Sequence, residues 1–192
     1  MVFLVEIILA SKSPRRHELL SMMGYAFTVQ VTASPEPPPS RELLPEENLK
    51  LITAAKGRET ALVNPDCAVI AADTVVVLNG KYYGKPADEN DALRMLTELS
   101  GKTHEVYTGV SVFHAAGGYT QFDFERTPVT FKKLTKTVIL DYIKTGEPMD
   151  KAGAYGIQGY GAKLIERVDG DFYNVMGLPV GLLRAMLFNL VG

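Results

Sequence analysis

The run Ser11-Lys12-Ser13-Pro14-Arg15-Arg16 has the residue types and spacing of an anion-binding turn. A strand-like segment, Glu6–Ala10, precedes it and a helical pattern follows, so free backbone N–H groups and a positive helix end would face an anion. Pro14 suits the first helical position because it lacks an N–H, and the two arginines supply planar donors that match phosphate oxygens. A capped surface helix with a solvated arginine pair explains the same residues equally well.

A second chemical feature is Asp73, which follows the apolar segment Val69–Ala72. A carboxylate at the end of a buried strand lies at the rim of the sheet, where α/β ligand sites usually occur. There it could bind a metal ion or act as a general base. The alternative is an aspartate that caps a turn. Further along, Gly84-Lys85-Pro86 places a lysine between two residues that shape the backbone, and this lysine is either aimed at an anion or a solvated loop residue.

A third feature is the glycine-rich segment Asp150–Gly161. Its glycines allow the backbone to approach another backbone segment or a ligand closely. The segment matches neither the Walker pattern nor the dinucleotide-binding fingerprint. Gln158 carries both a donor and an acceptor, so its amide could pair with the O4 and N3–H edge of uracil or thymine. The alternative is an irregular connection whose amide satisfies backbone groups.

The elements that must position these residues alternate along the chain, and hydrophobic periodicity and turn residues indicate their bounds. The predicted strands are Glu6–Ala10, Phe27–Val31, Val69–Ala72, Val75–Leu78, Lys81–Tyr83, Glu105–Phe113, Tyr119–Phe131 and Lys163–Val168. The predicted helices are Pro14–Met23, Pro45–Leu62, Asp88–Leu99, Lys136–Lys144 and Val180–Leu190. Hairpins are expected at Asn79-Gly80 and Gly117-Gly118. In the helix from Pro45, Leu51 and Leu62 are among the apolar residues at helical spacing.

Length and composition exclude several classes of protein. A chain of 192 residues with 46% hydrophobic residues and a net charge of -2 is neither disordered nor a coating for polyanions. It suits one sizeable domain, or two small lobes that share a cleft. The single cysteine, Cys67, allows no internal disulfide and is expected in the core. We find neither a signal sequence nor a membrane-spanning run, so the expected location is the cytoplasm.

The motifs and their order resemble the Maf family of nucleoside triphosphate pyrophosphatases. The resemblance covers nearly the whole chain, and its matching segments are Ser11–Arg16, Ala72–Thr74, Gly84–Pro86, Leu99–His104, Asp150–Gly159 and Val175–Pro179. The form of the segment around Gln158 is similar to the branch that hydrolyses dTTP and UTP. The branch that acts on 7-methyl-GTP usually carries an acidic residue in this segment.

The resemblance implies a fold, a reaction and a cofactor. The expected fold is a single α/β domain over residues 1–192, with a mixed twisted central sheet flanked by helices and two lobes around a nucleotide-binding cleft, similar to the inosine triphosphatase-like fold. The expected reaction cleaves a nucleoside triphosphate between the α and β phosphates with Mg²⁺ or Mn²⁺. The family also suggests a cytoplasmic homodimer, and we expect no nucleic-acid or membrane partner.

The resemblance also assigns roles to individual residues. Asp73 matches the general base and, with Glu36, the metal-binding positions. Residues linked to substrate specificity are Arg15, Thr74 and Gln158. Residues expected around the triphosphate are Ser13, Arg16, Lys56 and Lys85. The loop around Glu36 contains more proline and fewer acidic residues than in many relatives.

Another function and another catalytic role are compatible with some of these residues. A nucleotide-binding regulator of cell division or septum formation, acting through partners, could keep the same site. Ser11 or Ser13 could be a covalent nucleophile, but no histidine and aspartate partners can be assigned to either, and a phosphate-binding turn explains both hydroxyls.

Overall fold

The computed structural model describes residues 5–31, 37–40 and 42–191, and it confirms the predicted alternation of strands and helices. The strands are β1 (Ile7–Leu9), β2 (Phe27–Val29), β3 (Ala68–Leu78), β4 (Lys81–Tyr83), β5 (Thr103–His114), β6 (Tyr119–Phe131) and β7 (Ile165–Val168). The helices are α1 (Pro14–Met22), α2 (Pro45–Val63), α3 (Glu89–Leu99), α4 (Lys136–Ile143), α5 (Phe172–Met176) and α6 (Val180–Val191). Three 3₁₀ helices are η1 (Glu147–Asp150), η2 (Ala152–Ala154) and η3 (Gly159–Leu164).

The strands form one mixed sheet, as predicted. Its order is β2-β1-β3-β5-β6-β7, and β4 pairs with β3 outside this path. β1 is parallel to both β2 and β3, whereas the β3–β4 and β6–β7 pairs are antiparallel. Parallel strands need a crossover connection. α1 connects β1 to its neighbour β2, and α2 leads from β2 past β1 to β3.

The chain divides into two compact units. The first consists of residues 1–73, 108–125 and 177–192, and the second of residues 74–107 and 126–176. The strands β3, β5 and β6 contribute residues to both units. The arrangement of two lobes around a cleft within one domain stays a prediction.

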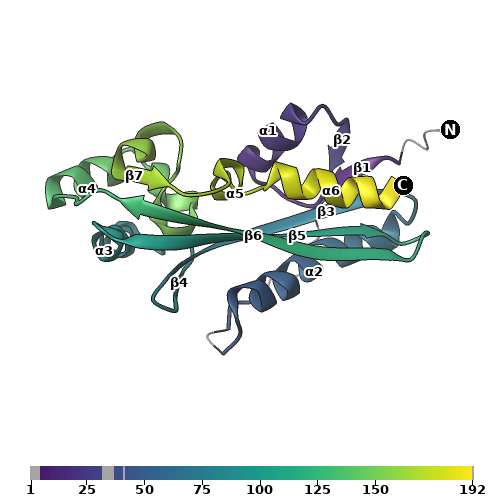
Figure 1. Cartoon of the computed structure of the whole chain (residues 1–192), viewed down its shortest axis with the longest axis horizontal. Coiled ribbons are helices and arrows are strands. Elements are labelled where there is room, and N and C mark those ends of the chain that lie inside the picture. The colour runs from purple at the N-terminus through teal and green to yellow at the C-terminus, as the bar shows by residue number, and fades with distance from the viewer. Residues whose placement is uncertain (1–4, 32–36, 41, 192) are drawn as a thin grey trace. The chain divides into compact units, whose positions relative to one another are not determined.

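The first unit is built on the parallel strands β1 and β3. Figure 1 shows α1 and α6 on one face of this part of the sheet and α2 on the other. α2 lies close to the sheet at Gly57, where an added Cβ would meet the Phe113 ring at 2.5 Å and Ala71 at 3.0 Å. The predicted apolar positions Leu51 and Leu62 are 55% and 68% exposed, because the buried side of α2 is the one that carries Gly57.

The second unit has its own hydrophobic core. α3 packs its predicted residues Ala92, Leu96 and Leu99 into this core, together with Met95. The other buried members come from the second-unit ends of the long strands, from β4, from α4 and from the 3₁₀ helices with the adjoining Tyr155. The short helix α5 was not predicted, since five residues are too few to show a helical period.

Two predictions about the central strand were wrong. Asp73 does not end a strand, because β3 runs without interruption from Ala68 to Leu78 and Asp73 lies in its middle. Cys67 is half-buried rather than a fully buried core residue, since it precedes the strand and packs only at the edge of the cluster formed by Val69 and its neighbours.

Candidate functional site

The strand order creates a topological switch point at β1. From β1 the chain crosses through α1 to β2 on one side, and from β2 it crosses through α2 to β3 on the other side. Where two crossovers run in opposite directions along a sheet, a crevice opens at the carboxyl ends of the strands. Ligands of open α/β sheets bind in this crevice. The run Ser11–Arg16 follows β1 at this position.

The register of β1 and β3 brings the same turn toward Asp73. Leu9 pairs with Ile70, and the Ala10 N–H donates to the Ile70 carbonyl oxygen at 2.8 Å. Because the strands are parallel, the chain after Leu9 starts alongside the β3 residues that lead from Ile70 to Asp73. The serine-rich turn and Asp73 therefore lie in the same part of the first unit.

The turn after β1 is organised by the buried hydroxyl of Ser11. Its Oγ accepts hydrogen bonds from the Ser13 N–H at 3.2 Å and from Arg16 Nη1 at 3.3 Å. The Ser11 carbonyl oxygen lies 2.8 Å from His17 Nε2. Ser13 is the residue before α1, and its side chain makes no capping hydrogen bond. Ser11 thus shapes the turn, and the Ser13 hydroxyl is not used to cap the helix.

The two arginines differ in environment. Arg16 is only 9% exposed, and its Nε donates to the Gly177 carbonyl oxygen at 2.8 Å. Arg15 is half-buried. The alternative of a solvated arginine pair is therefore wrong for Arg16. Because Arg16 donates to both Gly177 and Ser11, it holds the turn in shape, which the sequence pattern did not reveal.

Lys56 and Asp73 are brought together by α2 and β3. Lys56 Nζ lies 2.5 Å from Asp73 Oδ1, and the two side chains are 13% and 21% exposed. These residues are 17 positions apart in the sequence, and the crossover through α2 places them side by side. An ammonium beside a half-buried carboxylate is suited to binding substrate phosphates and to proton transfer.

Thr74 and Lys85 belong to the second unit. Thr74 follows Asp73 in β3 and is half-buried, and Lys85 is exposed in the loop between β4 and α3. The backbone of this loop is fixed on both sides of Lys85. The Gly153 N–H donates to the Gly84 carbonyl oxygen at 3.0 Å, and the Ala87 N–H donates to Asp91 Oδ2 at 3.1 Å.

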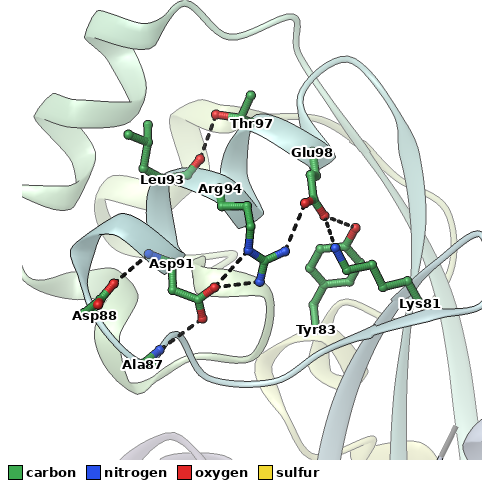
Figure 2. A network of polar contacts seen from close by, with 9 residues as sticks. All are labelled: Lys81, Tyr83, Ala87, Asp88, Asp91, Leu93, Arg94, Thr97 and Glu98. Carbon is green, nitrogen blue, oxygen red and sulfur yellow. Dashed lines mark hydrogen bonds and ion pairs between the residues drawn. The ribbon is translucent and has the colours of Figure 1, made fainter.

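A polar network connects the two elements that flank this loop (Figure 2). Glu98 of α3 accepts from Lys81 Nζ and from the Tyr83 hydroxyl of β4, both at 2.6 Å. Arg94 donates to Glu98 at 3.0 Å and to Asp91 at 2.6 Å. Hydrogen bonds from Lys81 and Tyr83 lower the pKa of Glu98 to about 2, so its carboxylate stays charged and holds β4 against α3.

Gln158 is exposed and directly precedes η3. Its side chain makes no capping hydrogen bond to that helix. The segment around it is folded against Glu147, whose carboxylate accepts from the backbone N–H groups of Tyr160 and Gly161. Glu147 was not predicted. The only signal was an acidic residue shortly before the glycines, which is common in loops.

The predicted metal ligands are Asp73 and Glu36, and the metal site stays a prediction. Glu36 lies outside the described residues, and over the described ranges no group of three or more histidine, cysteine, aspartate or glutamate side chains could hold a metal ion. Mg²⁺ in nucleotide sites is usually bound by one or two carboxylates, with phosphates and water as the other ligands. Asp73, a half-buried carboxylate in the strand beside the turn after β1, fits this mode.

In the part of the chain that the structure describes, no helix has the length and apolar character needed to cross a membrane.

Comparisons with known proteins agree with the geometry. Residues 6–190 match the family model described as Maf-like protein. The dTTP/UTP pyrophosphatase of Bacillus pumilus is 46% identical over 175 residues, covering 91% of each chain. The dTTP/UTP pyrophosphatase of Deinococcus radiodurans is 48% identical, covering 94% of this chain and 91% of the relative. The structure of the Staphylococcus aureus Ham1 protein has a TM-score of 0.54 at 16% identity and covers 96% of this chain and 99% of that one, so the two share a fold.

Proposed function

Because the chain belongs to the Maf-like protein family, we propose that it hydrolyses dTTP and UTP to the nucleoside monophosphate and pyrophosphate. The observation that carries this proposal is the β1–β3 register, which leads the turn after β1 alongside the strand that bears the Lys56–Asp73 pair, so phosphate donors and a carboxylate occur together in the first unit. Modified pyrimidine triphosphates are further proposed substrates.

The triphosphate carries about four negative charges, so its binding requires several donors and cations. Ser13 and Arg15 at the start of α1 offer a hydroxyl and a guanidinium to phosphate oxygens, and the N-terminus of α1 adds its dipole. Arg16 keeps this turn in shape through Ser11 and Gly177. Lys56 and Lys85 are the proposed ammonium donors.

Asp73 is the proposed general base. It takes a proton from a water molecule whose oxygen attacks the α-phosphorus, and the bond from the α-phosphorus to the oxygen bridging to the β-phosphorus breaks. Pyrophosphate leaves with the bonding electron pair. The ion pair with Lys56 engages Oδ1 of the carboxylate. A cation at this place also stabilises the negative charge that develops on the phosphoryl oxygens.

We also propose that Mg²⁺ or Mn²⁺ is required, with Asp73 and Glu36 as its protein ligands. A bound divalent ion would neutralise phosphate charge and orient the triphosphate. Thr74 and Gln158 are the proposed specificity residues of the second unit. We further propose that the protein is a cytoplasmic homodimer and that it binds neither nucleic acid nor membranes. Light scattering of the purified chain tests the dimer.

A product assay in ¹⁸O-labelled water tests the reaction. The wild-type chain is incubated with UTP, dTTP, CTP and GTP, with Mg²⁺, with Mn²⁺ or with EDTA. We expect pyrophosphate and labelled monophosphate in equal amounts from UTP and dTTP, and none in EDTA. Release of orthophosphate would show cleavage at the wrong bond. Tight UTP binding without turnover would favour the nucleotide-binding regulator instead.

A further inference from the structure

The segment that carries Gln158 is folded around the side chain of Glu147. Glu147 begins η1 after Gly146, whose φ of 73° turns the chain at the end of α4. Its carboxylate receives three hydrogen bonds. The Tyr142 hydroxyl donates to Oε1 at 2.9 Å, the Gly161 N–H donates to Oε1 at 3.0 Å, and the Tyr160 N–H donates to Oε2 at 2.8 Å.

The Glu147 carboxylate and the Tyr142 hydroxyl that donates to it together bind both sides of Gln158 in the sequence. Tyr160 and Gly161 follow Gln158, and the Gly156 N–H before it donates to the Tyr142 hydroxyl at 3.1 Å. Tyr142 is fully buried, and this burial, together with the Glu147 carboxylate, raises the pKa of its hydroxyl, so it keeps the proton that it donates to Glu147. Gln158 therefore lies in a short loop whose two ends are hydrogen-bonded to the Tyr142–Glu147 pair, which is the anchor of this loop.

The glycines of this loop are required by its closeness to Glu147. A Cβ on Gly159 would lie 2.6 Å from Glu147 Oε2, and the φ of Gly159 is 64°, which favours glycine. A Cβ on Gly161 would collide with the Gly156 carbonyl oxygen and lie 2.8 Å from the Tyr142 hydroxyl. The backbone thus closes on itself and on the anchor, with no room for side chains at these positions.

We propose that Glu147 is a positioning residue that holds the Gln158 amide in the orientation that selects uracil and thymine over cytosine. This inference rests on the proposed function, in which Gln158 recognises the base. Uracil and thymine offer O4 and N3–H to an amide, whereas cytosine offers the reverse pattern, an amino group and an acceptor at N3. An amide can rotate to satisfy either pattern, so its selectivity depends on what fixes its position.

Glu147→Gln is the informative change, because it keeps the shape of the side chain and removes one acceptor. An amide has only one oxygen, so a backbone N–H of Tyr160 or Gly161 would face an NH₂ group. The loop would then shift to relieve this contact, and Gln158 would shift with it. Glu166→Gln in β7 makes the same chemical change at an exposed residue and serves as the matched control.

The experiment measures kcat/KM for UTP and CTP in the wild type, Glu147→Gln, Gln158→Ala, the double variant and Glu166→Gln. The ratio of the two constants does not depend on the fraction of folded protein. We expect Glu147→Gln to narrow the UTP preference by about tenfold, equivalent to ~1.4 kcal/mol. The double variant should narrow the UTP preference no further than Gln158→Ala does, because Glu147 acts only through the contact that the Gln158 amide makes with the base. Glu166→Gln should leave it unchanged.

Equal losses for UTP and CTP in Glu147→Gln, or independent effects in the double variant, would overturn the proposal. If Glu147→Gln does not fold, Tyr142→Phe removes one donor to the carboxylate, and it should narrow the ratio in the same direction by a smaller factor. Amide hydrogen exchange at Tyr160 and Gly161 tests the anchor without any substrate, and unchanged protection in Glu147→Gln would also overturn it. Absence of UTP turnover in the wild type would instead reject the proposed function.

Discussion

Lys56 Nζ lies 2.5 Å from Asp73 Oδ1, and this pair joins the second crossover helix to the middle of the central strand β3. The two side chains are mostly shielded from water, so their attraction is stronger than that of an exposed ion pair. A carboxylate held in this way by a cation has a defined position in the strand that runs beside the proposed anion-binding turn.

Asp73→Asn should abolish turnover of UTP while UTP still binds. The amide keeps the size of the side chain but cannot accept a proton from water. Steady-state kinetics and calorimetric titration measure the two effects separately. Asp66→Asn, at an exposed turn position before β3, is the control and should behave as wild type. Turnover of Asp73→Asn within about tenfold of wild type, a barrier change near 1.4 kcal/mol, would reject Asp73 as the base.

Arg15→Ala and Arg16→Ala should have different effects. Arg16→Ala removes hydrogen bonds to Gly177 and Ser11, and a bond from a charged donor contributes about 1.5–3 kcal/mol. For a chain of this length, each kcal/mol lowers Tm by about 2–4 °C. We therefore expect a clear loss of Tm for Arg16→Ala. Arg15→Ala should mainly weaken triphosphate binding, and equal Tm losses for both variants would contradict this division.

Lys85→Ala should weaken binding of UTP much more than binding of UMP. The hydrogen bonds at Gly84 and Ala87 fix the loop backbone, so the substitution removes a charge without releasing the loop. Binding constants for both nucleotides at two salt concentrations provide the measurement, and Lys136→Ala at an exposed position of α4 is the control. A similar loss for UMP and UTP would place Lys85 away from the β and γ phosphates.

Glu98 should make the second unit sensitive to acid at very low pH. Its folded-state pKa is lowered from 4.5 to about 2, so the folded state prefers the charged form. This contribution to stability is present above pH 4.5 and is lost as the pH falls toward 2. In Glu98→Gln the free energy of unfolding should change less over this window, whereas Glu89→Gln at an exposed position should retain the wild-type slope.

His104 should add a second acid-sensitive window at higher pH. It is buried against Phe131 and Tyr155, and burial lowers its pKa from 6.5 to about 4. The unfolded state then binds more protons than the folded state between these values, so stability falls as the pH drops from 6.5 to 4. His104→Gln should remove this slope in urea unfolding experiments. A control variant, His114→Gln, should keep it.

Local patterns in the sequence determined most of the secondary structure and the chemical character of the site. The turn after β1, the Asn79-Gly80 hairpin and the apolar side of α3 depend on neighbouring residues, so their types and spacing are sufficient to predict them. The resemblance of the motifs supplied the family. The role of Asp73 stays a prediction, and its expected place at a strand end was wrong because β3 continues to Leu78.

Only the tertiary structure decided which residues far apart in the sequence contact one another. The ion pair of Lys56 with Asp73, the anchoring of Arg16 by Gly177 and the enclosure of Glu147 by the Gln158 loop join residues that the chain separates. The exposure of Leu51 and the burial of Gly57 on α2 also depend on which side of the helix meets the sheet. Such contacts arise from crossover connections and packing. Composition and local periodicity do not predict them, because the same local pattern is compatible with many long-range partners.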